Sequence, residues 1–135
     1  MSLAAIALAA LFFVLLNALF VAAEFALIGA SRLTLEQRAP NDRLAAGVLR
    51  IVSSPVGQDR YLATAQLGIT VASLGLGMFG EHQLAEYLTS RISAFEMIGG
   101  MAGASIVAIT ILTILHIVIG EMLPKGLALQ NPIRI

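Results

Sequence analysis

The segment GEMLPKG, Gly120 to Gly126, ends a run of more than twenty largely apolar residues with a carboxylate, a proline and a lysine. Proline has no amide N–H, so Pro124 leaves the carbonyl four residues before it without a helical partner. That carbonyl belongs to Gly120, which has no side chain to cover it, and Glu121 adds a carboxylate beside it. Such backbone is tolerated at membrane depth only where it lines a cavity or is buried in protein. If the apolar run spans a membrane, the segment predicts a polar site where the run ends.

The composition indicates the class of protein. Of the 135 residues, 59% are hydrophobic and 12% are charged, whereas soluble domains carry about 25% charged residues. A single domain of this length cannot bury so much apolar surface in water, which indicates a membrane protein. The zero net charge argues against nucleic-acid binding. The absence of cysteine excludes disulfides, thiolate metal sites and cysteine nucleophiles.

Three apolar stretches are long enough to cross a bilayer, which takes about 20 helical residues. They cover residues 2–30, 61–80 and 97–120, and they leave a loop at 31–60 and a tail at 121–135. The predicted fold is an all-α membrane protein with three transmembrane helices and short juxtamembrane or cytoplasmic helices.

The connecting segments carry weaker signals. The first helix is expected to continue past Ser31 toward Gln37, and the Pro-Asn-Asp sequence at 40–42 predicts a turn. Apolar residues and arginines over 43–51 are typical of a short amphipathic helix on a membrane surface. Residues 81–91 predict a short polar helix on the outer side.

The distribution of lysine and arginine predicts the orientation. Arginines are concentrated between the first and second spans, at Arg32, Arg38, Arg43, Arg50 and Arg60. The loop between the second and third spans carries only Arg91, and the tail carries Lys125 and Arg134. The positive-inside rule therefore places the first loop and the C-terminus in the cytoplasm and the N-terminus outside.

Polar residues of all three spans are expected at a similar depth. At 1.5 Å per helical residue from the nearest cytoplasmic basic residue, Glu24, Gln66 and Thr70 lie about 9–15 Å inside the membrane. Gly120 and Glu121 lie about 6–8 Å inside. Ionisable residues within spans are costly and commonly functional. Oxygen donors of this kind suit Mg²⁺, Ca²⁺ or Mn²⁺, so the sequence predicts a hard-cation site near the inner leaflet.

Each span also carries a polar stripe at helical spacing, and facing stripes would line one cavity. The three stripes are Asn17, Glu24 and Ser31; Gln66, Thr70 and Ser73; and Thr113, His116 and Gly120. Structural roles compete with this interpretation. Asn17 could bridge two helices or a dimer seam, and hydroxyls such as Ser73 and Thr113 commonly bond back to their own helix. His116 is more commonly a structural hydrogen-bond donor than a ligand or a proton carrier.

A hinge is predicted at the end of the third span, because Gly120 and Pro124 together favour a kink. Lys125 has an alternative, structural role, which is to neutralise Glu121 at the membrane boundary. Gly68 in the second span serves either as a flexible point or, more commonly for such glycines, as a place of close helix packing.

Three motifs carry a resemblance to a known family. GEMLPKGLALQNP at 120–132, NALFVAAEFALIGASR at 17–32 and ATAQLGIT at 63–70 resemble the transmembrane domain of the CorC/CorB magnesium transporters. These are the prokaryotic relatives of the eukaryotic cyclin-M proteins, and the resemblance covers nearly the whole chain. The family's motif residues map onto Glu24, Gly120, Glu121, Pro124 and Lys125. Many relatives have serines just before the first glutamate, where this chain has Val21-Ala22-Ala23, so Asn17, Glu24 or backbone oxygen is expected to replace their hydroxyls.

The resemblance implies a homodimer with three transmembrane helices per subunit and a juxtamembrane helical belt, in the inner membrane of a prokaryote. It implies export of Mg²⁺ from an acidic, cytoplasm-facing cavity by alternating access, driven by inward Na⁺ flow. Residues Glu24, Gly120, Glu121, Asn17, Gln66 and Thr70 are the expected metal contacts. Relatives continue into cytoplasmic CBS domains that bind ATP, and this chain stops shortly after Pro132 without a terminating signal. A longer natural protein is therefore expected.

Two other classes of function compete with transport. The chain could be a membrane anchor and dimerisation module for a regulatory soluble domain, with its acidic residues making only structural hydrogen bonds. An intramembrane protease is disfavoured, because the sequence has no His-Glu-x-x-His zinc motif and no serine in a recognisable arrangement with His116. The expectation is that the protein is not an enzyme.

Overall fold

The computed structural model of the chain describes residues 2–92 and 99–130. Within these ranges the chain is helical and has no strand. The elements are α1 (Leu3–Gly29), α2 (Arg32–Arg38), α3 (Arg43–Val52), α4 (Pro55–Gly75), the π-helix η1 (Leu76–Gly80), α5 (Glu81–Arg91), α7 (Met101–Leu115), the π-helix η2 (His116–Met122) and α8 (Leu123–Gln130).

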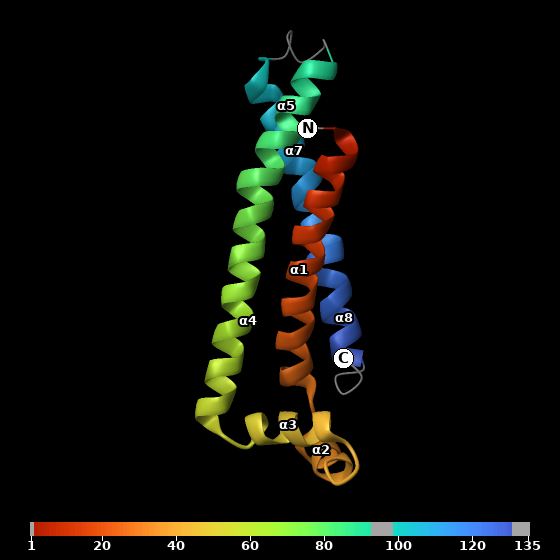
Figure 1. Ribbon diagram of the computed structural model, residues 1–135, viewed down its shortest axis with the longest axis vertical. Coiled ribbons are helices and arrows are strands. Elements are labelled where there is room, and N and C mark those ends of the chain that lie inside the picture. Colours follow the sequence, from red (N-terminus) through yellow and green to blue (C-terminus); the bar gives the residue numbers. More distant parts are fainter. Residues whose placement is uncertain (1, 93–98, 131–135) are drawn as a thin grey trace.

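All of these elements except α2 and α3 join into three long rods that run side by side (Figure 1). The first is α1; the second, α4–η1–α5, runs continuously from Pro55 to Arg91; and the third, α7–η2–α8, runs from Met101 to Gln130. All three are long and apolar enough to cross a membrane, which confirms the predicted all-α fold with three candidate spans. The expected start of the third span at Met97 lies outside the described residues, as do Pro132 and Arg134.

The first rod ends earlier than predicted. Helix α1 stops at Gly29, and Ala30 and Ser31 have extended backbone before α2 begins at Arg32. The expectation of one helix through Ser31 is wrong, and Gly29, a poor helix former, is the last residue of α1. Ser31 is exposed at the start of α2, so it does not continue the polar stripe of α1.

The second rod is longer at both ends than the predicted span 61–80. It begins at Pro55, where Ser54 Oγ accepts a hydrogen bond from the Gly57 amide at 3.2 Å and proline occupies the first turn. Capping sets this start, and a hydropathy pattern does not register capping. The polar helix expected at 81–91 is present as α5, but η1 joins it to α4 without a break.

The third rod runs through Pro124 instead of ending at residue 120. Within η2 the backbone changes to π-helical hydrogen bonding, and the Leu123 amide donates to the carbonyl of Val118, five residues earlier. A π-helix absorbs an extra residue while both flanking helices continue. Pro124 then falls in the first turn of α8, where a missing N–H is tolerated. The helix therefore does not end near residue 120, as the sequence had suggested.

Helix α3 confirms the predicted amphipathic segment. Asp42 caps it, because its Oδ1 accepts hydrogen bonds from the amides of Leu44 at 2.9 Å and Ala45 at 3.3 Å. In Figure 1, α3 lies crosswise below the lower ends of α1 and α4. This direction suits a helix that lies on a membrane surface.

The rods pack through small residues and a few larger ones. Ala10, Val14, Leu76 and Leu112 form one buried cluster between them, while Ala85, Ala104 and Ala108 let α5 and α7 approach closely. Aromatic rings of α1 lie over glycines of α4. A Cβ added to Gly68 would lie 2.5 Å from the Phe20 ring, and one added to Gly75 would meet the Phe13 ring. Gly68 is thus a close-packing position in α4.

We expect Gly68→Ala to destabilise the protein by about 1–3 kcal/mol, because the added methyl group overpacks against Phe20. The measurement is thermal unfolding in detergent. Gly77→Ala is the matched control, since a Cβ at Gly77 has nothing within 4 Å. Adding Phe20→Leu should recover most of the loss. Equal effects of the two glycine changes would contradict the packing argument.

Candidate functional site

The polar residues of α1 and α4 meet in two layers because both helices use the same spacing. Asn17 and Glu24 are seven residues apart on α1, and Gln66 and Ser73 are seven apart on α4. The two helices run in opposite directions (Figure 1). Asn17 therefore meets Ser73 and Glu24 meets Gln66. We call these the central layer and the lower layer, the lower being nearer α3.

The central layer is organised by Asn17, which is 0% exposed. Its Nδ2 donates a hydrogen bond of 2.8 Å to the Gly120 carbonyl, the group that Pro124 deprives of an α-helical partner. A Cβ at position 120 would lie 3.1 Å from that nitrogen, so glycine permits the close approach. Asn17 thus bridges two helices and supports the Gly120 carbonyl.

Three more side chains extend the central layer toward the surface. Ser73 Oγ donates to Asn17 Oδ1 at 3.4 Å and lies 3.4 Å from His116 Nε2. The same ring nitrogen lies 3.1 Å from Glu121 Oε1. The Glu121 side chain is 47% exposed and that of His116 is 15% exposed. A continuous polar chain therefore leads from the buried Asn17 amide to a carboxylate at the surface of the three rods.

The π-helix explains why His116 and Glu121 face each other. Residues five apart lie on different sides of an α-helix but come close to one another in a π-helix. The predicted stripe of Thr113, His116 and Gly120 assumed α-helical spacing throughout. In the structure Thr113 is exposed on α7 and has no side-chain hydrogen bond among the described residues. The change to π-geometry brings Glu121 into the layer in its place.

The lower layer contains Glu24, which is half-buried, and Gln66, which is exposed. Gln66 Nε2 donates to Glu24 Oε1 at 3.5 Å. Thr70 does not join them, because its hydroxyl bonds back to the Gln66 carbonyl at 2.9 Å. Phe25 follows Glu24 in the sequence, and Lys125 Nζ lies 4.8 Å from the centre of its ring.

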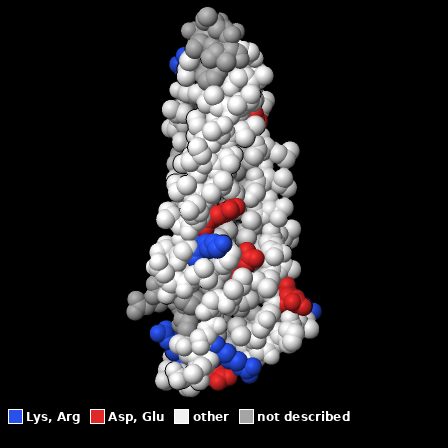
Figure 2. All heavy atoms as spheres, turned by 180° about the vertical axis from the view of Figure 1, so that it is seen from behind, with Lys and Arg blue, Asp and Glu red and all other residues white. Residues whose placement is uncertain are grey.

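The alternative pairing of Lys125 with Glu121 is not seen. In the described part of the chain, Glu121 instead contacts the His116 ring at 3.1 Å, and Lys125 forms no ion pair. Lys125 instead has a cation–π contact with Phe25. Figure 2 shows acidic and basic groups close together near the middle of one face, above the charged groups that gather at its lower end.

The two layers also correct the predicted depths. Gly120 contacts Asn17, which lies seven residues before Glu24 on α1, a separation of about 10 Å. The estimate that placed Gly120 and Glu24 at similar depth took Lys125 as the boundary of the span. The third rod continues past Lys125, so Gly120 lies farther from α3 than Glu24 does.

No group of three or more His, Asp or Glu side chains comes together within residues 2–92 and 99–130. The carboxylates instead occur singly, one in each layer, beside amide, hydroxyl and carbonyl oxygens. Sequence reasoning missed Tyr61, whose hydroxyl donates to the Ala23 carbonyl at 2.8 Å and so ties α4 to α1 next to Glu24. A tyrosine near the start of a span is the signal that was available.

Comparison with known proteins agrees with these features. Residues 8–135 match the family model described as the cyclin M transmembrane N-terminal domain. The chain belongs to this family. The resemblance to CorC/CorB-type proteins, stated from the three motifs, is thereby confirmed.

Individual relatives of this cyclin M domain are bacterial. The UPF0053 protein YhdP of Bacillus subtilis is 36% identical over 118 residues, which cover 86% of this chain and 26% of the relative. The uncharacterized protein MT1889 of Mycobacterium tuberculosis is 36% identical over 87% of this chain and 33% of the relative. The UPF0053 protein sll0260 of Synechocystis is 30% identical over 88% of this chain and 27% of the relative. The chain thus spans a third or less of these relatives. No solved structure matches it significantly.

We expect Asn17→Leu to destabilise this cyclin M domain by about 1–3 kcal/mol, because the buried Gly120 carbonyl loses its donor. The loss should be smaller by about 1 kcal/mol in a Pro124→Ala background, where residue 124 regains an amide N–H. Thermal unfolding of the single and double variants measures this coupling. Leu127→Ala, an exposed change on α8, is the control, and its effect on stability should add to that of Asn17→Leu. If the effects of Asn17→Leu and Pro124→Ala were also additive, the argument that both act on the Gly120 carbonyl would be contradicted.

Proposed function

We propose that the chain is the transmembrane domain of a magnesium transporter that exports Mg²⁺ from the cytoplasm. The observation that carries this proposal is the pair of carboxylates, Glu24 and Glu121, on two different rods within apolar surroundings. Glu24 is half-buried, and the side chain of Glu121 is about half exposed at the surface of the rods. Acidic residues at such positions in spanning helices are expensive and point to an ion pathway.

The donor types in the two layers suit a small hard cation. Glu24 and Glu121 supply carboxylate oxygen, Gln66 supplies an amide oxygen when its amide turns, and Gly120 supplies a carbonyl oxygen. Magnesium prefers oxygen ligands and gives up its water reluctantly. A site with few protein ligands would leave the ion part of its hydration shell. Asn17 acts in this proposal as a positioning residue for the Gly120 carbonyl.

Alternating access requires an element that changes shape. The π-helix η2 contains Gly120 and Glu121 and lies directly before Pro124, and π-helical turns are frequent at functional sites. We assign the hinge to η2 instead of to a proline kink. Movement there would change the reach of Glu121 and the exposure of the Gly120 carbonyl together.

The remaining parts of the proposal follow from the family. The protein works as a homodimer, Na⁺ entering the cell drives Mg²⁺ out, and cytoplasmic domains beyond this chain bind ATP and regulate it. The positive-inside rule sets the orientation, with α2 and α3 on the cytoplasmic side of a prokaryotic inner membrane.

A second candidate is a membrane anchor and dimerisation module. The chain spans only a third or less of each relative. This favours an anchor, because most of the length of those proteins lies outside the region that the chain matches. In this alternative, Glu24 and Glu121 make only the hydrogen bonds described above. Ion binding separates the two candidates, since an anchor requires none.

We expect Glu24→Gln and Glu121→Gln each to weaken Mg²⁺ binding by about tenfold or more, in line with losses of about 10–100-fold for removal of groups that support metal ligands. Titration calorimetry of the chain in detergent measures binding, and Mg²⁺ flux from liposomes measures transport. Glu86→Gln, an exposed change on α5, is the control. Unchanged binding in the Glu24→Gln, Glu121→Gln double variant would refute the site and favour the anchor.

Cysteine labelling tests the orientation, because the chain contains no cysteine of its own. Ser53 lies between α3 and α4, Ser90 lies near the end of α5, and both are exposed. We expect Ser53→Cys to react with an impermeant maleimide only from the cytoplasmic side and Ser90→Cys only from outside. The reverse pattern would overturn the direction of transport.

A further inference from the structure

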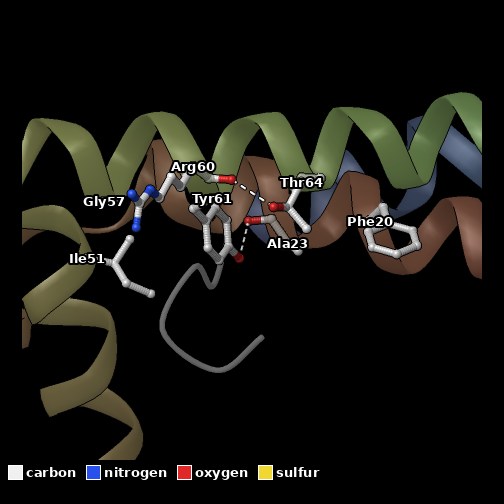
Figure 3. Close-up of a pocket in the computed structure, with 8 residues that line it drawn as sticks. Phe20, Ala23, Ile51, Gly57, Arg60, Tyr61 and Thr64 are labelled. Carbon is white, nitrogen blue, oxygen red and sulfur yellow. Dashed lines mark hydrogen bonds between the residues drawn. The ribbon is translucent and has the colours of Figure 1, made fainter.

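A pocket of about 420 Å³ lies where α1, α3 and α4 meet at the lower end of the molecule, and neither Glu24 nor Gln66 lines it. Figure 3 shows its walls: Phe20 and Ala23 from α1, Ile51 from α3, and one face of α4. It is therefore distinct from both polar layers.

The face of α4 that lines the pocket changes from charged to apolar along its length. Gly57, Arg60, Tyr61, Thr64 and Ala65 line it, at the spacing of residues that share one side of a helix. The face is about 12 Å long. Arg60 and Tyr61 lie toward the start of α4, while Thr64 and Ala65 lie farther into the rod.

The polar groups in this pocket are already paired, with one exception. The Tyr61 hydroxyl donates to the Ala23 carbonyl at 2.8 Å, and the Thr64 hydroxyl donates to the Arg60 carbonyl at 2.8 Å. The Arg60 guanidinium is exposed and forms no ion pair with any carboxylate in residues 2–92 and 99–130. The pocket thus offers one cationic group at one end and apolar surface along the rest.

The surroundings of the pocket match a membrane surface. Residues 31–60 carry five arginines and three carboxylates. One carboxylate, Asp42, caps α3, and another, Glu36, pairs with Arg32. Large apolar side chains are exposed at the same end, with Leu33 at 64%, Leu44 at 81% and Val56 at 61%. Basic residues beside exposed apolar residues bind anionic lipid surfaces.

We propose that this pocket binds an anionic phospholipid of the cytoplasmic leaflet, with its phosphate beside Arg60 and one acyl chain along α4 toward Ala65 and Phe20. The order from charge to apolar wall is the order that a lipid of that leaflet presents from headgroup to tail. The inference rests on the proposed orientation but does not depend on magnesium transport. Ile51 closes the pocket from α3, so a bound lipid would hold α3 against α4.

The test uses the full chain purified with phosphatidylglycerol and phosphatidylcholine in equal amounts, and counts the lipids retained by native mass spectrometry. We expect selective retention of phosphatidylglycerol. Arg60→Gln should reduce it by about fivefold, the effect of one basic residue near an anionic surface. Thr64→Phe, at an exposed position, should reduce retention of either lipid by filling the apolar end. Arg50→Gln, an exposed arginine of α3 outside the pocket, is the matched control and should change retention less than twofold.

Three results would overturn the proposal. Equal retention of the two lipids would show a non-selective contact, and an equal loss with Arg50→Gln and Arg60→Gln would show only diffuse charge attraction. A Thr64→Cys variant that forms a disulfide between two copies in membranes would show that a second chain covers the pocket. Magnesium binding is measured separately, so failure of the lipid proposal is distinguishable from failure of the transport proposal.

Discussion

The hydrogen bond from Asn17 to the Gly120 carbonyl is the constraint on which the rest of the site depends. Pro124 removes the α-helical donor of that carbonyl, and a buried carbonyl without a partner costs about 1–3 kcal/mol. The partner comes from another rod, at 2.8 Å and in a fully buried position. The bond therefore fixes α1 against η2 and sets which residues of α4 come opposite them.

From that fixed point, the electrostatics of the three rods follow. The seven-residue spacing on α1 and α4 places one carboxylate in the lower layer, and the π-geometry of η2 brings the second into the central layer. Each carboxylate has a neutral or titratable partner, an amide for Glu24 and an imidazole for Glu121. Lys125 contacts an aromatic ring and leaves both acids free of a permanent cation among the described residues. Acidic character is thereby retained at a depth where it is costly.

The sequence was sufficient for the number of long helices, the amphipathic α3 and the Gly120 carbonyl that lacks an α-helical donor, because apolar length, Asp42 and Pro124 act locally. It was insufficient where tertiary geometry decides. Hydropathy contains no sign of an extra residue absorbed within a helix, so η2, the exposure of Thr113 and the contact of Glu121 with His116 were not foreseen. The predicted depths failed for the same reason, since Lys125 was taken as the end of a rod that continues.

The π-helical turn of η2 also determines the rotation of α8 about its own axis. One residue contributes about 100° of turn in an α-helix. Each extra residue that a π-helix absorbs therefore rotates the following segment by about 100° less than the same residues would in an α-helix. Were η2 to tighten without any change in composition, α8 would swivel about its own axis. Lys125 would lose its contact with the Phe25 ring, and the buried Ala128 would rotate away from the residues that now surround it. A local change from π-helical to α-helical hydrogen bonding in η2 would thus change contacts along the whole of α8.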